Sequence, residues 1–526
     1  MSTRNKCLLL LVAVPLSCWM VLGQSRGGNW PTFGGDALRS SWSSTDASIN
    51  RDSVKDLQLL WKIKLEAQSR GSRQVMPPVI LGRLISYRGF RELGFVATNA
   101  DLVYSLDVDL GTIFWTKHLE YSTRDPQIMT STWRCPGGLT AMPTMPVPAP
   151  RGGAAGRGAP APAVPPVPGQ RGSPFIGGPA SVYAISSDGR LHRLNTSTGD
   201  DMTQPISVIP ANARATNLTM VDNVIYTVTS NECGGAPNAV WAIDLSVDPV
   251  KVRSFALNAG GSRPGGTAIG SDGTTYVRTG DGRLLALRAR DLQLKDYYLL
   301  GEKNGEGEGN PTASPVVLPY ENRDVIATDC GTAQLCLLDS TALGGSQHDT
   351  PMFKTPPIVQ AARNASDTAE RGIFGSLASW QEMDGTRFVL ASVVGPAHAD
   401  LRAPAGNGPT PNGFIVAFKV QEQGGKRTLE PAWISRDLQS PVAPIVVNGV
   451  VFALSAGELS RPDERPKGST RATLYALDAR TGKELYSSKN LVTGPAALTG
   501  LSAGTGRVYF GGVDGSLYAF GMYMEH

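Results

Sequence analysis

A short pattern of alternating apolar and small residues, followed by a polar turn, recurs along the whole chain. Its clearest copy runs from Leu474 to Tyr486. Leucine and alanine alternate over the first half of this copy, as in a half-buried β-strand, and Asp478 to Gly482 have the composition of a tight turn that requires a positive φ. The copy therefore predicts a strand, a turn and a second strand.

Eight such copies can be recognised. They begin at Val103, Leu191, Val240, Leu284, Leu335, Phe414, Leu474 and Leu517. The smallest spacings between equivalent positions, 43 and 44 residues, match the period of a four-stranded propeller blade. Two longer spacings contain insertions, of which the segment Pro143–Pro174 consists almost entirely of Pro, Gly, Ala and Arg. We expect this segment to be a flexible loop within the second blade, because it has too few apolar side chains to order itself.

The two ends of the chain complement each other. The last copy stops at Phe520–Gly521 without an outermost strand, whereas Leu59–Leu65 reads as a strand with no partners of its own. Pairing the two would close a ring and remove exposed sheet edges. The sequence therefore predicts an all-β protein, an eight-bladed β-propeller of four-stranded antiparallel blades closed by an N-terminal strand, over residues 24–526.

Composition and charge narrow the classes of function. The 526 residues include 60 Gly and 38 Pro, which is typical of many short strands joined by turns. The net charge of +4 is small and the basic residues are scattered, so we expect no binding to nucleic acid. No pair among the five histidines has metal-ligand spacing.

The N-terminal residues 1–23 resemble a signal peptide. Arg4 and Lys6 precede an apolar run that Pro15 interrupts, and no second apolar span follows. We therefore expect export to the periplasm or the medium, with no transmembrane anchor. Four cysteines remain after cleavage, and an even number in an exported protein permits two disulfides. The candidates are Cys135, Cys233, Cys330 and Cys336; Cys330 and Cys336 flank a short turn, which leaves Cys135 and Cys233 to pair, and four free buried thiols are the alternative.

The N-terminal region resembles a known family. Asn29–Asp36, together with Ile49–Asn50, Val54, Leu57 and Trp61, is similar to the signature of the quinoprotein propellers, and the Leu-Asp-x-x-Thr-Gly unit resembles their repeat. That family comprises the dehydrogenases that use pyrroloquinoline quinone (PQQ) and non-catalytic relatives. In its active members PQQ lies over the propeller axis, one calcium ion holds its acidic groups, and a carboxylate acts as general base.

The resemblance implies positions for these roles. Glu232 and Asp281 fall where the family places calcium-binding side chains, so both are candidates for metal and cofactor binding. Glu308 lies about where the catalytic carboxylate stands. Cys135 and Gly137 lie where many members place a disulfide of adjacent cysteines over the cofactor. Each position also has an ordinary explanation: Asp281 precedes Gly282 in a natural hairpin turn, and Glu308 lies in a glycine-rich polar loop.

Departures from the family pattern argue against tight binding of PQQ. The chain has no adjacent cysteines, and Gly265–Ile269 lacks the tryptophan that stacks beneath the quinone. The fifth-blade turn, Asp329–Ala333, lacks the usual cation. A planar polyanion without a stacking surface and a cation loses much of its binding energy.

Three functions remain open at this point. The first is an exported, degenerate quinoprotein that binds a small molecule or a protein at the propeller axis or rim. The second is a PQQ- and calcium-dependent alcohol or sugar dehydrogenase. The third is an envelope scaffold that resembles the propeller of the outer-membrane assembly machinery. The repeat itself does not distinguish them, because it is a structural device that catalytic and non-catalytic members share.

Overall fold

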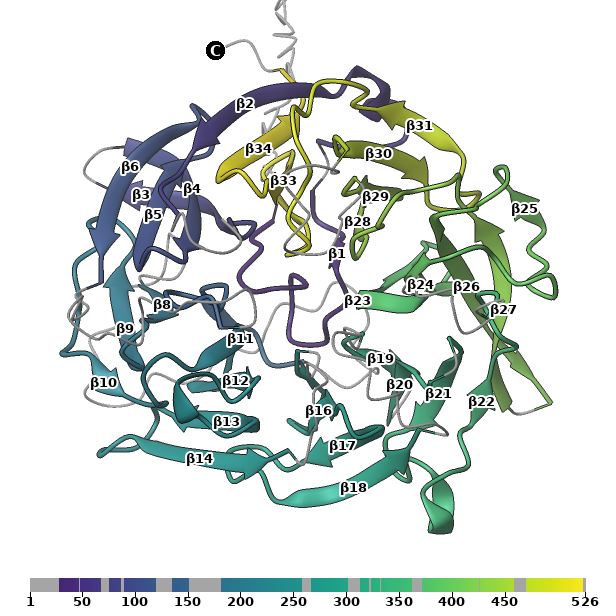
Figure 1. Cartoon of the computed structure of the whole chain (residues 1–526), viewed down its shortest axis with the longest axis horizontal. Helices are drawn as coiled ribbons and strands as arrows, with labels where there is room; N and C mark the ends of the chain where they lie inside the picture. The colour runs from purple at the N-terminus through teal and green to yellow at the C-terminus, as the bar shows by residue number, and fades with distance from the viewer. Residues whose placement is uncertain are drawn as a thin grey trace, which may run out of the picture.

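The strands form a ring of eight blades around a central axis (Figure 1). The computed structural model describes residues 28–46, 48–67, 75–86, 89–119, 135–150, 181–257, 266–300, 313–320, 323–331, 333–361, 371–424, 426–457 and 470–523. We name the strands of a blade A to D from the axis outward. The eight-bladed, all-β architecture predicted from the repeats is therefore confirmed.

The first four blades follow each other in chain order. Blade one contains β3 (Val79–Ser86), β4 (Gly89–Thr98), β5 (Leu102–Asp107) and β6 (Thr112–His118); blade two contains β8 (Ser181–Ile185), β9 (Arg190–Asn195) and β10 (Ile206–Ser207). Blade three contains β11 (Arg214–Val221), β12 (Val224–Ser230), β13 (Ala239–Asp244) and β14 (Lys251–Ala256); blade four contains β15 (Ala268–Ile269), β16 (Thr275–Arg278), β17 (Arg283–Leu287) and β18 (Leu294–Leu299). The described residues also form short 3₁₀ helices, η1 (Val54–Asp56), η3 (Cys233–Gly235) and η4 (Gly345–Gln347).

The remaining blades complete the ring. Blade five contains β19 (Val316–Tyr320), β20 (Arg323–Asp329), β21 (Leu335–Asp339) and β22 (Phe353–Lys354); blade six contains β23 (Gly372–Gln381), β24 (Arg387–Val394), β26 (Gly413–Gln423) and β27 (Lys426–Ile434), with β25 (Ala405–Gly406) outside it. Blade seven contains β28 (Ile445–Val447), β29 (Val450–Ser455), β30 (Thr473–Asp478) and β31 (Glu484–Ser487); blade eight contains β32 (Ser502–Gly504), β33 (Arg507–Gly511), β34 (Ser516–Gly521) and β2 (Gln58–Lys64).

The N-terminal strand β2 closes the ring as predicted. It lies antiparallel to β34, with Leu59 opposite Phe520 and Lys62 opposite Tyr518. In Figure 1 the two strands lie side by side, β2 in dark violet and β34 in yellow. Blade eight therefore takes three strands from the end of the chain and one from its beginning, which joins the two ends of the chain within one sheet.

The segment before β2 runs through the centre of the ring, where it appears as the violet trace in Figure 1. Its backbone and side chains bond to the inner edge of successive blades. The bonds join Trp30 to Ile80, Pro31 to Met145, Thr32 to Leu218, Ala37 to Ile269, Leu38 to Val317, Ser40 to Ser379, Ser41 to Val446 and Asp46 to Gly506. Within this segment β1 (Trp42–Ser43) lies parallel to β28. The N-terminal residues thus form a hub that contacts the whole ring.

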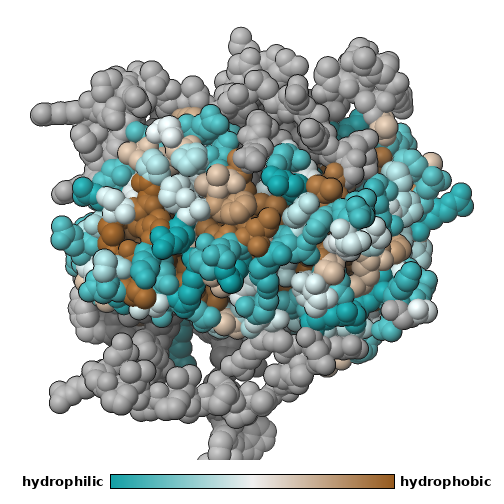
Figure 2. Space-filling model, turned by 90° about the horizontal axis from the view of Figure 1, so that it is seen from below, coloured by the Kyte–Doolittle hydropathy of each residue, from teal (hydrophilic) through white to brown (hydrophobic). Residues whose placement is uncertain are grey.

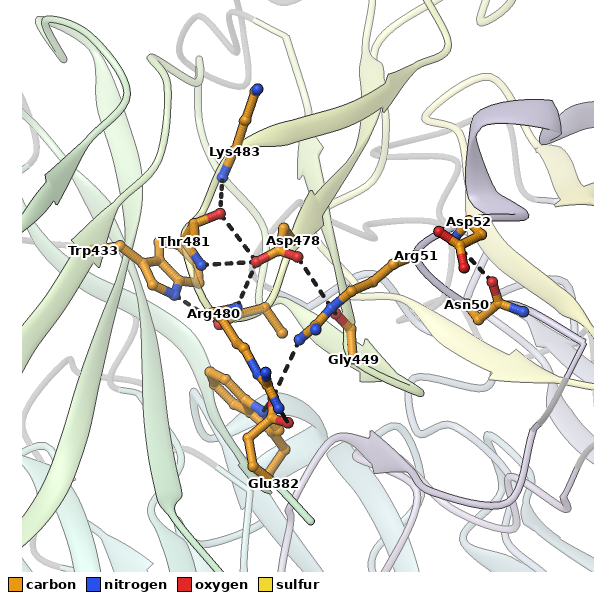
Figure 3. A network of polar contacts seen from close by, with 12 residues as sticks. Asn50, Arg51, Asp52, Glu382, Trp433, Gly449, Asp478, Arg480, Thr481 and Lys483 are labelled. Atoms are coloured by element: carbon orange, nitrogen blue, oxygen red, sulfur yellow. Dashed lines mark hydrogen bonds and ion pairs between the residues drawn. The ribbon is translucent and has the colours of Figure 1, made fainter. Parts of the chain in front are cut away.

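The hub continues into a polar network that joins blades six and seven (Figure 3). Arg51 lies 3.4 Å from the carboxylate of Glu382 and 3.0 Å from that of Asp478. Arg480 donates to the other oxygen of Glu382 at 2.8 Å. Ion pairs of Arg51 therefore attach the N-terminal segment to two blades before the chain turns outward to β2.

Tryptophans on outermost strands pack against the turn of the next blade. Trp433 of β27 donates its indole N–H to the carbonyl of Ala479 at 2.8 Å, and its ring lies on Gly482 of the turn in the clearest repeat. A Cβ at Gly482 would lie 2.4 Å from the ring, and this residue has a φ of 68°. The repeat requires glycine at this position because the turn needs a left-handed backbone and the tryptophan leaves no space for a side chain.

The same arrangement recurs at two other junctions. Trp61 donates to the carbonyl of Val108 and its ring lies on Gly111, whereas Trp115 donates to Thr196 and lies on Gly199. The three tryptophans are therefore packing residues between neighbouring blades.

The start of the Pro-rich insertion is ordered. Thr144 pairs with Tyr183 in blade two, and β7 (Pro146–Val147) lies parallel to the inner edge of β11. Met145, which is fully buried, anchors this stretch. The rest of the expected loop lies outside the described residues. The first residues of the expected flexible loop are thus ordered, since they pair with blades two and three.

The outer surface of the ring is mixed in polarity. Figure 2 views the ring edge-on from the side of β14 and β18 and shows hydrophobic patches among hydrophilic residues. Leu294 and Leu299, on β18, are 45% and 41% exposed. Within the part of the chain that the structure describes, no helix is long and apolar enough to cross a membrane.

Candidate functional site

The turns between strands B and C of all blades lie at one end of the ring, which we call the BC rim. Successive blades are oriented alike, as the parallel bridge between Ser314 and Ser376 of neighbouring inner strands shows. Asp101 in the BC turn of blade one accepts hydrogen bonds from Ser187 in that of blade two. Residues that follow strand B in different blades can therefore cooperate in one site.

The structure places Glu232 and Asp281 on this rim, in the BC turns of the adjacent blades three and four. The two carboxylates therefore lie at the same end of the ring. Their surroundings differ, however, and these surroundings decide what each carboxylate can bind.

Glu232 is exposed at the tip of its turn. Its φ is 53°, and the preceding Asn231 has a φ of 63°, both in the left-handed region. Next to it, Cys233 forms a disulfide with Cys135, which comes from the chain that leads into blade two. The side chain of Glu232 therefore projects from a turn whose conformation is unfavourable for residues other than glycine.

Asp281 is already engaged within its own turn. Its carboxylate accepts hydrogen bonds from the Nε of Arg283, at 3.0 Å, and from the hydroxyl of Thr279. A calcium ligand must offer its oxygens to the metal, and a hydrogen-bonded guanidinium competes for both charge and lone pairs. The structure thus gives Asp281 the role of a turn-forming residue that is neutralised by Arg283.

A cation does occupy the fifth-blade turn, although the sequence of that turn contains none. Arg278 reaches across from β16, and its Nη2 lies 3.2 Å from Oδ2 of Asp329 while its Nε donates to the Asp329 carbonyl. The Arg278 side chain is fully buried, so it faces the protein and not an open cavity. Burial raises the pKa of Asp329, and the charge of Arg278 opposes that rise. No sequence pattern reveals this pair, because the two residues belong to different blades.

The fifth-blade turn also carries the second disulfide, between Cys330 and Cys336. Both cysteines are almost fully buried, at 1% and 0% exposure. The bridge closes the hairpin directly after Asp329. It therefore fixes the turn that the buried guanidinium contacts.

The expected stacking position over the axis is filled by the hub. At Gly266 an added Cβ would lie 3.2 Å from Nη2 of Arg39 and 3.4 Å from Oγ of Ser314. Arg39 is fully buried and donates to the carbonyls of Thr267 and Phe33 and to the hydroxyl of Thr219. Burial lowers the pKa of Arg39 to about 10, which leaves it charged at neutral pH. The guanidinium of Arg39 and the backbone at Gly266 thus occupy the position where the family resemblance implies a stacking tryptophan.

The remaining predicted residues add little to a cofactor site. Glu308 lies outside the described residues. Gly137 has a φ of 67° and open space on its Cα, beside the half-buried Cys135. Among the residues that the structure describes, no three His, Cys, Asp or Glu side chains are grouped as metal ligands.

One polar cluster in blade two could not be predicted from the sequence. His192 Nδ1 lies 3.0 Å from the carboxylate of Asp201, and Nε2 lies 3.1 Å from Oγ of Ser186. This is the order of a serine–histidine–aspartate triad. Ser186 is only 3% exposed, however, and its hydroxyl also bonds to Asp188, so a substrate has no access to it. No motif surrounds these residues, and the cluster ties the strands of blade two together.

These surroundings do not fit PQQ and calcium. The carboxylate of Asp281 is paired with Arg283, and the cation of the fifth-blade turn is buried against Asp329. The space at Gly266 is taken by Arg39. Of the groups expected to hold the cofactor, Glu232 alone is both described and openly exposed on the rim.

Comparison with known proteins supports the fold. No protein-family model and no curated protein matches the chain. Among solved structures, it is similar to quinohaemoprotein alcohol dehydrogenase from Comamonas testosteroni, with a TM-score of 0.56 and 15% identity over 95% of this chain and 81% of that one. A europium-containing methanol dehydrogenase gives 0.54 and 11%, over 94% and 98%. A quinohaemoprotein alcohol dehydrogenase from Pseudomonas putida HK5 gives 0.52 and 14%, over 94% and 80%. The chain thus shares the propeller fold of these dehydrogenases, as its sequence predicted.

Proposed function

We propose that this protein is a quinoprotein-like propeller that no longer uses PQQ and instead binds a ligand at the BC rim. The single observation that carries the proposal is the occupation of the expected cofactor positions by the protein's own cations. Arg39 lies against Gly266, Arg278 is buried on Asp329, and Arg283 holds Asp281. Charged groups that are already paired within the protein contribute little binding energy to a metal ion or a polyanionic cofactor.

The rim favours a ligand that approaches from outside the ring. Glu232 projects from the BC rim, whereas the axis is crossed by the hub. A small cationic molecule or a protein with a basic surface suits an exposed carboxylate. Export is consistent with this function, because the two disulfides are typical of proteins in an oxidising compartment.

The proposal is tested by adding PQQ and calcium to the purified protein. We expect no change in the quinone absorbance and no shift in melting temperature at saturating cofactor, with a PQQ-dependent dehydrogenase as positive control. A saturable absorbance change together with a rise of several degrees would overturn the proposal and favour the dehydrogenase, because a ligand that binds the native state must stabilise it. The variant Asp281→Asn separates specific from adventitious binding, since only a true calcium site would lose affinity.

A further inference from the structure

The BC turn of blade three contains four residues with left-handed backbone, which glycine adopts readily and Glu232 does not. Asn231, Glu232, Gly234 and Gly235 have φ values of 63°, 53°, 63° and 73°. Left-handed backbone brings Cβ close to the following carbonyl oxygen, so it is strained for Glu232 in particular. Such a conformation persists only where the surrounding structure enforces it.

The base and the tip of this turn are held by different means. At the base, the hydroxyl of Thr229 donates to the Pro237 carbonyl at 2.6 Å and accepts a bond from the indole of Trp241 at 2.8 Å. At the tip, the disulfide from Cys233 to Cys135 crosses to a segment 98 residues away in the sequence. The base therefore stays in place without the disulfide. The tip also contacts the protein, through the bond from the Glu232 N–H to Oδ1 of Asn238 at 3.4 Å and through the packing of Gly234 on Ala211, and the disulfide adds the covalent restraint.

The other side of the bridge is anchored to blade one. A Cβ at Gly138 would lie 1.9 Å from the backbone oxygen of Asn99, so this stretch packs directly on the BC turn of blade one. Two residues on, Thr140 donates to the carbonyl of Ala215 at 2.9 Å. The segment that carries Cys135 is thus fixed to blades one and three. Opening of the bridge would therefore remove the covalent restraint on the turn that contains Glu232.

The two disulfides differ in their access to solvent. Cys330 and Cys336 are 1% and 0% exposed, and the Cys336 sulfur lies against the hydroxyl of Tyr298. Cys233 is similarly buried, at 2% exposure, but its partner Cys135 is only half-buried, so the first bridge offers one accessible side. Thiol–disulfide exchange requires a thiolate to reach one of the two sulfurs, so access decides which bridge reacts first.

We propose that the Cys135–Cys233 disulfide is a redox-sensitive tether that fixes the Glu232 turn when oxidised and releases it when reduced by a dithiol. One thiolate of the dithiol attacks the Cys135 sulfur, forms a mixed disulfide and displaces the Cys233 thiolate, which takes up a proton. The second thiolate then displaces Cys135. Two electrons and two protons pass to the protein, which gains two thiols, and the dithiol becomes a disulfide.

This inference concerns the control of the rim to which we assign ligand binding, and as a regulatory device it rests on that proposed function. Its chemistry can be measured without any ligand. Thiol labelling and amide exchange report on the tether, whereas PQQ titration reports on the function. A failure of one is therefore distinguishable from a failure of the other.

The first experiment exposes the folded, full-length protein to increasing dithiothreitol without denaturant, followed by alkylation and peptide mass spectrometry. We expect Cys135 and Cys233 to be labelled about tenfold faster than Cys330 and Cys336. Amide hydrogen exchange in residues 230–236 should rise about tenfold in the same samples, while the strands of blade three keep their protection. Equal labelling rates, the reverse order, or unchanged exchange in the turn would each overturn the proposal.

Two variants separate the effect of backbone strain at Glu232 from the effect of the Cys135–Cys233 disulfide on the turn. The double variant Cys135→Ser/Cys233→Ser should show the exchange of the reduced protein at every dithiothreitol concentration. Glu232→Gly keeps the disulfide but relieves the strain, because glycine accepts a φ of 53° without a steric cost. Its turn should therefore gain less exchange on reduction than that of the native protein. An equal gain would show that strain in Glu232 does not drive the release.

Discussion

The Nη2 of Arg278 in blade four lies 3.2 Å from Oδ2 of Asp329 in blade five, and this guanidinium is completely buried. The pair joins the BC turns of two blades at the end of the ring where the resemblance places a cofactor. Charges removed from water are tolerated only when they are paired, so each residue requires the other.

Asp329→Leu and Arg278→Met should each destabilise the fold by about 3–5 kcal/mol, because each leaves the other charge buried without its partner. The paired variant Arg278→Met/Asp329→Leu should recover most of that loss, since both charges leave together. Urea denaturation followed by tryptophan fluorescence measures both. If the losses of the two single variants simply add in the double variant, the residues do not act as a pair.

The tryptophan and glycine contact between blades six and seven predicts a second effect. Gly482→Ala should cost about 2–4 kcal/mol, since it combines left-handed strain with a Cβ 2.4 Å from the Trp433 ring. Gly385→Ala is a matched control: its φ is 89°, but nothing lies within 4 Å of the added Cβ. Thermal unfolding should show a clearly smaller loss for the control. Equal losses would mean that backbone strain alone, and not packing of the indole, explains the requirement for glycine.

The hub predicts a requirement for arginine rather than for positive charge. Arg39→Lys should lower the free energy of unfolding by roughly 3 kcal/mol, because an ammonium group cannot bond at once to Thr267, Phe33 and Thr219. The same change at the exposed Arg402 should alter it by less than about 0.5 kcal/mol. Chemical denaturation of both variants provides the comparison. A similarly small effect at both positions would show that the three hydrogen bonds of Arg39 do not stabilise the fold.

The network of Figure 3 predicts a dependence on pH. Burial alone would raise the pKa of Glu382, but hydrogen bonds from Arg480 and Trp380 and the charges of Arg480 and Arg51 lower it below its usual value. A lowered pKa in the folded state stabilises the protein above the unfolded pKa, and this contribution disappears as the pH falls through the folded value.

Glu382→Gln should therefore lower the melting temperature at pH 7 and have a diminishing effect in acid, with a loss of ~1 kcal/mol at neutral pH for this partly exposed group. Glu422→Gln, at an exposed position in the same blade, is the control. Melting curves between pH 7 and pH 3 measure the difference, and a constant gap over this range would refute the assigned role of the carboxylate.

The fold could be predicted from the sequence because its determinants are local and repeated. Each copy of the pattern encodes its own strands and turn, as Leu474 to Tyr486 do for β30 and β31. The closing strand was predictable because Leu59–Leu65 had strand character but no neighbours to pair with. These features depend on periodicity and on the absence of a partner, both of which are visible in the chain itself.

The site could be predicted only in outline. The BC turns of blades three and four were identified from the sequence. The sequence does not show, however, whether Asp281 pairs with the nearby Arg283 or stays free to bind a metal. Arg278 and Asp329 are 51 residues apart, and Arg39 and Thr267 are 228 apart. Such contacts arise from closure of the ring, and no local pattern contains them.

The hub has a consequence for how the molecule is assembled. The residues of the hub are synthesised early but are the last to find all of their neighbours, because Asp46 bonds to Gly506 and β2 pairs with β34. Until the final blade has been synthesised, the N-terminal segment has only part of its binding surface. Completion of the hub and closure of the ring are thus a single late event in folding, and a chain truncated near its C-terminus would leave both ends without partners.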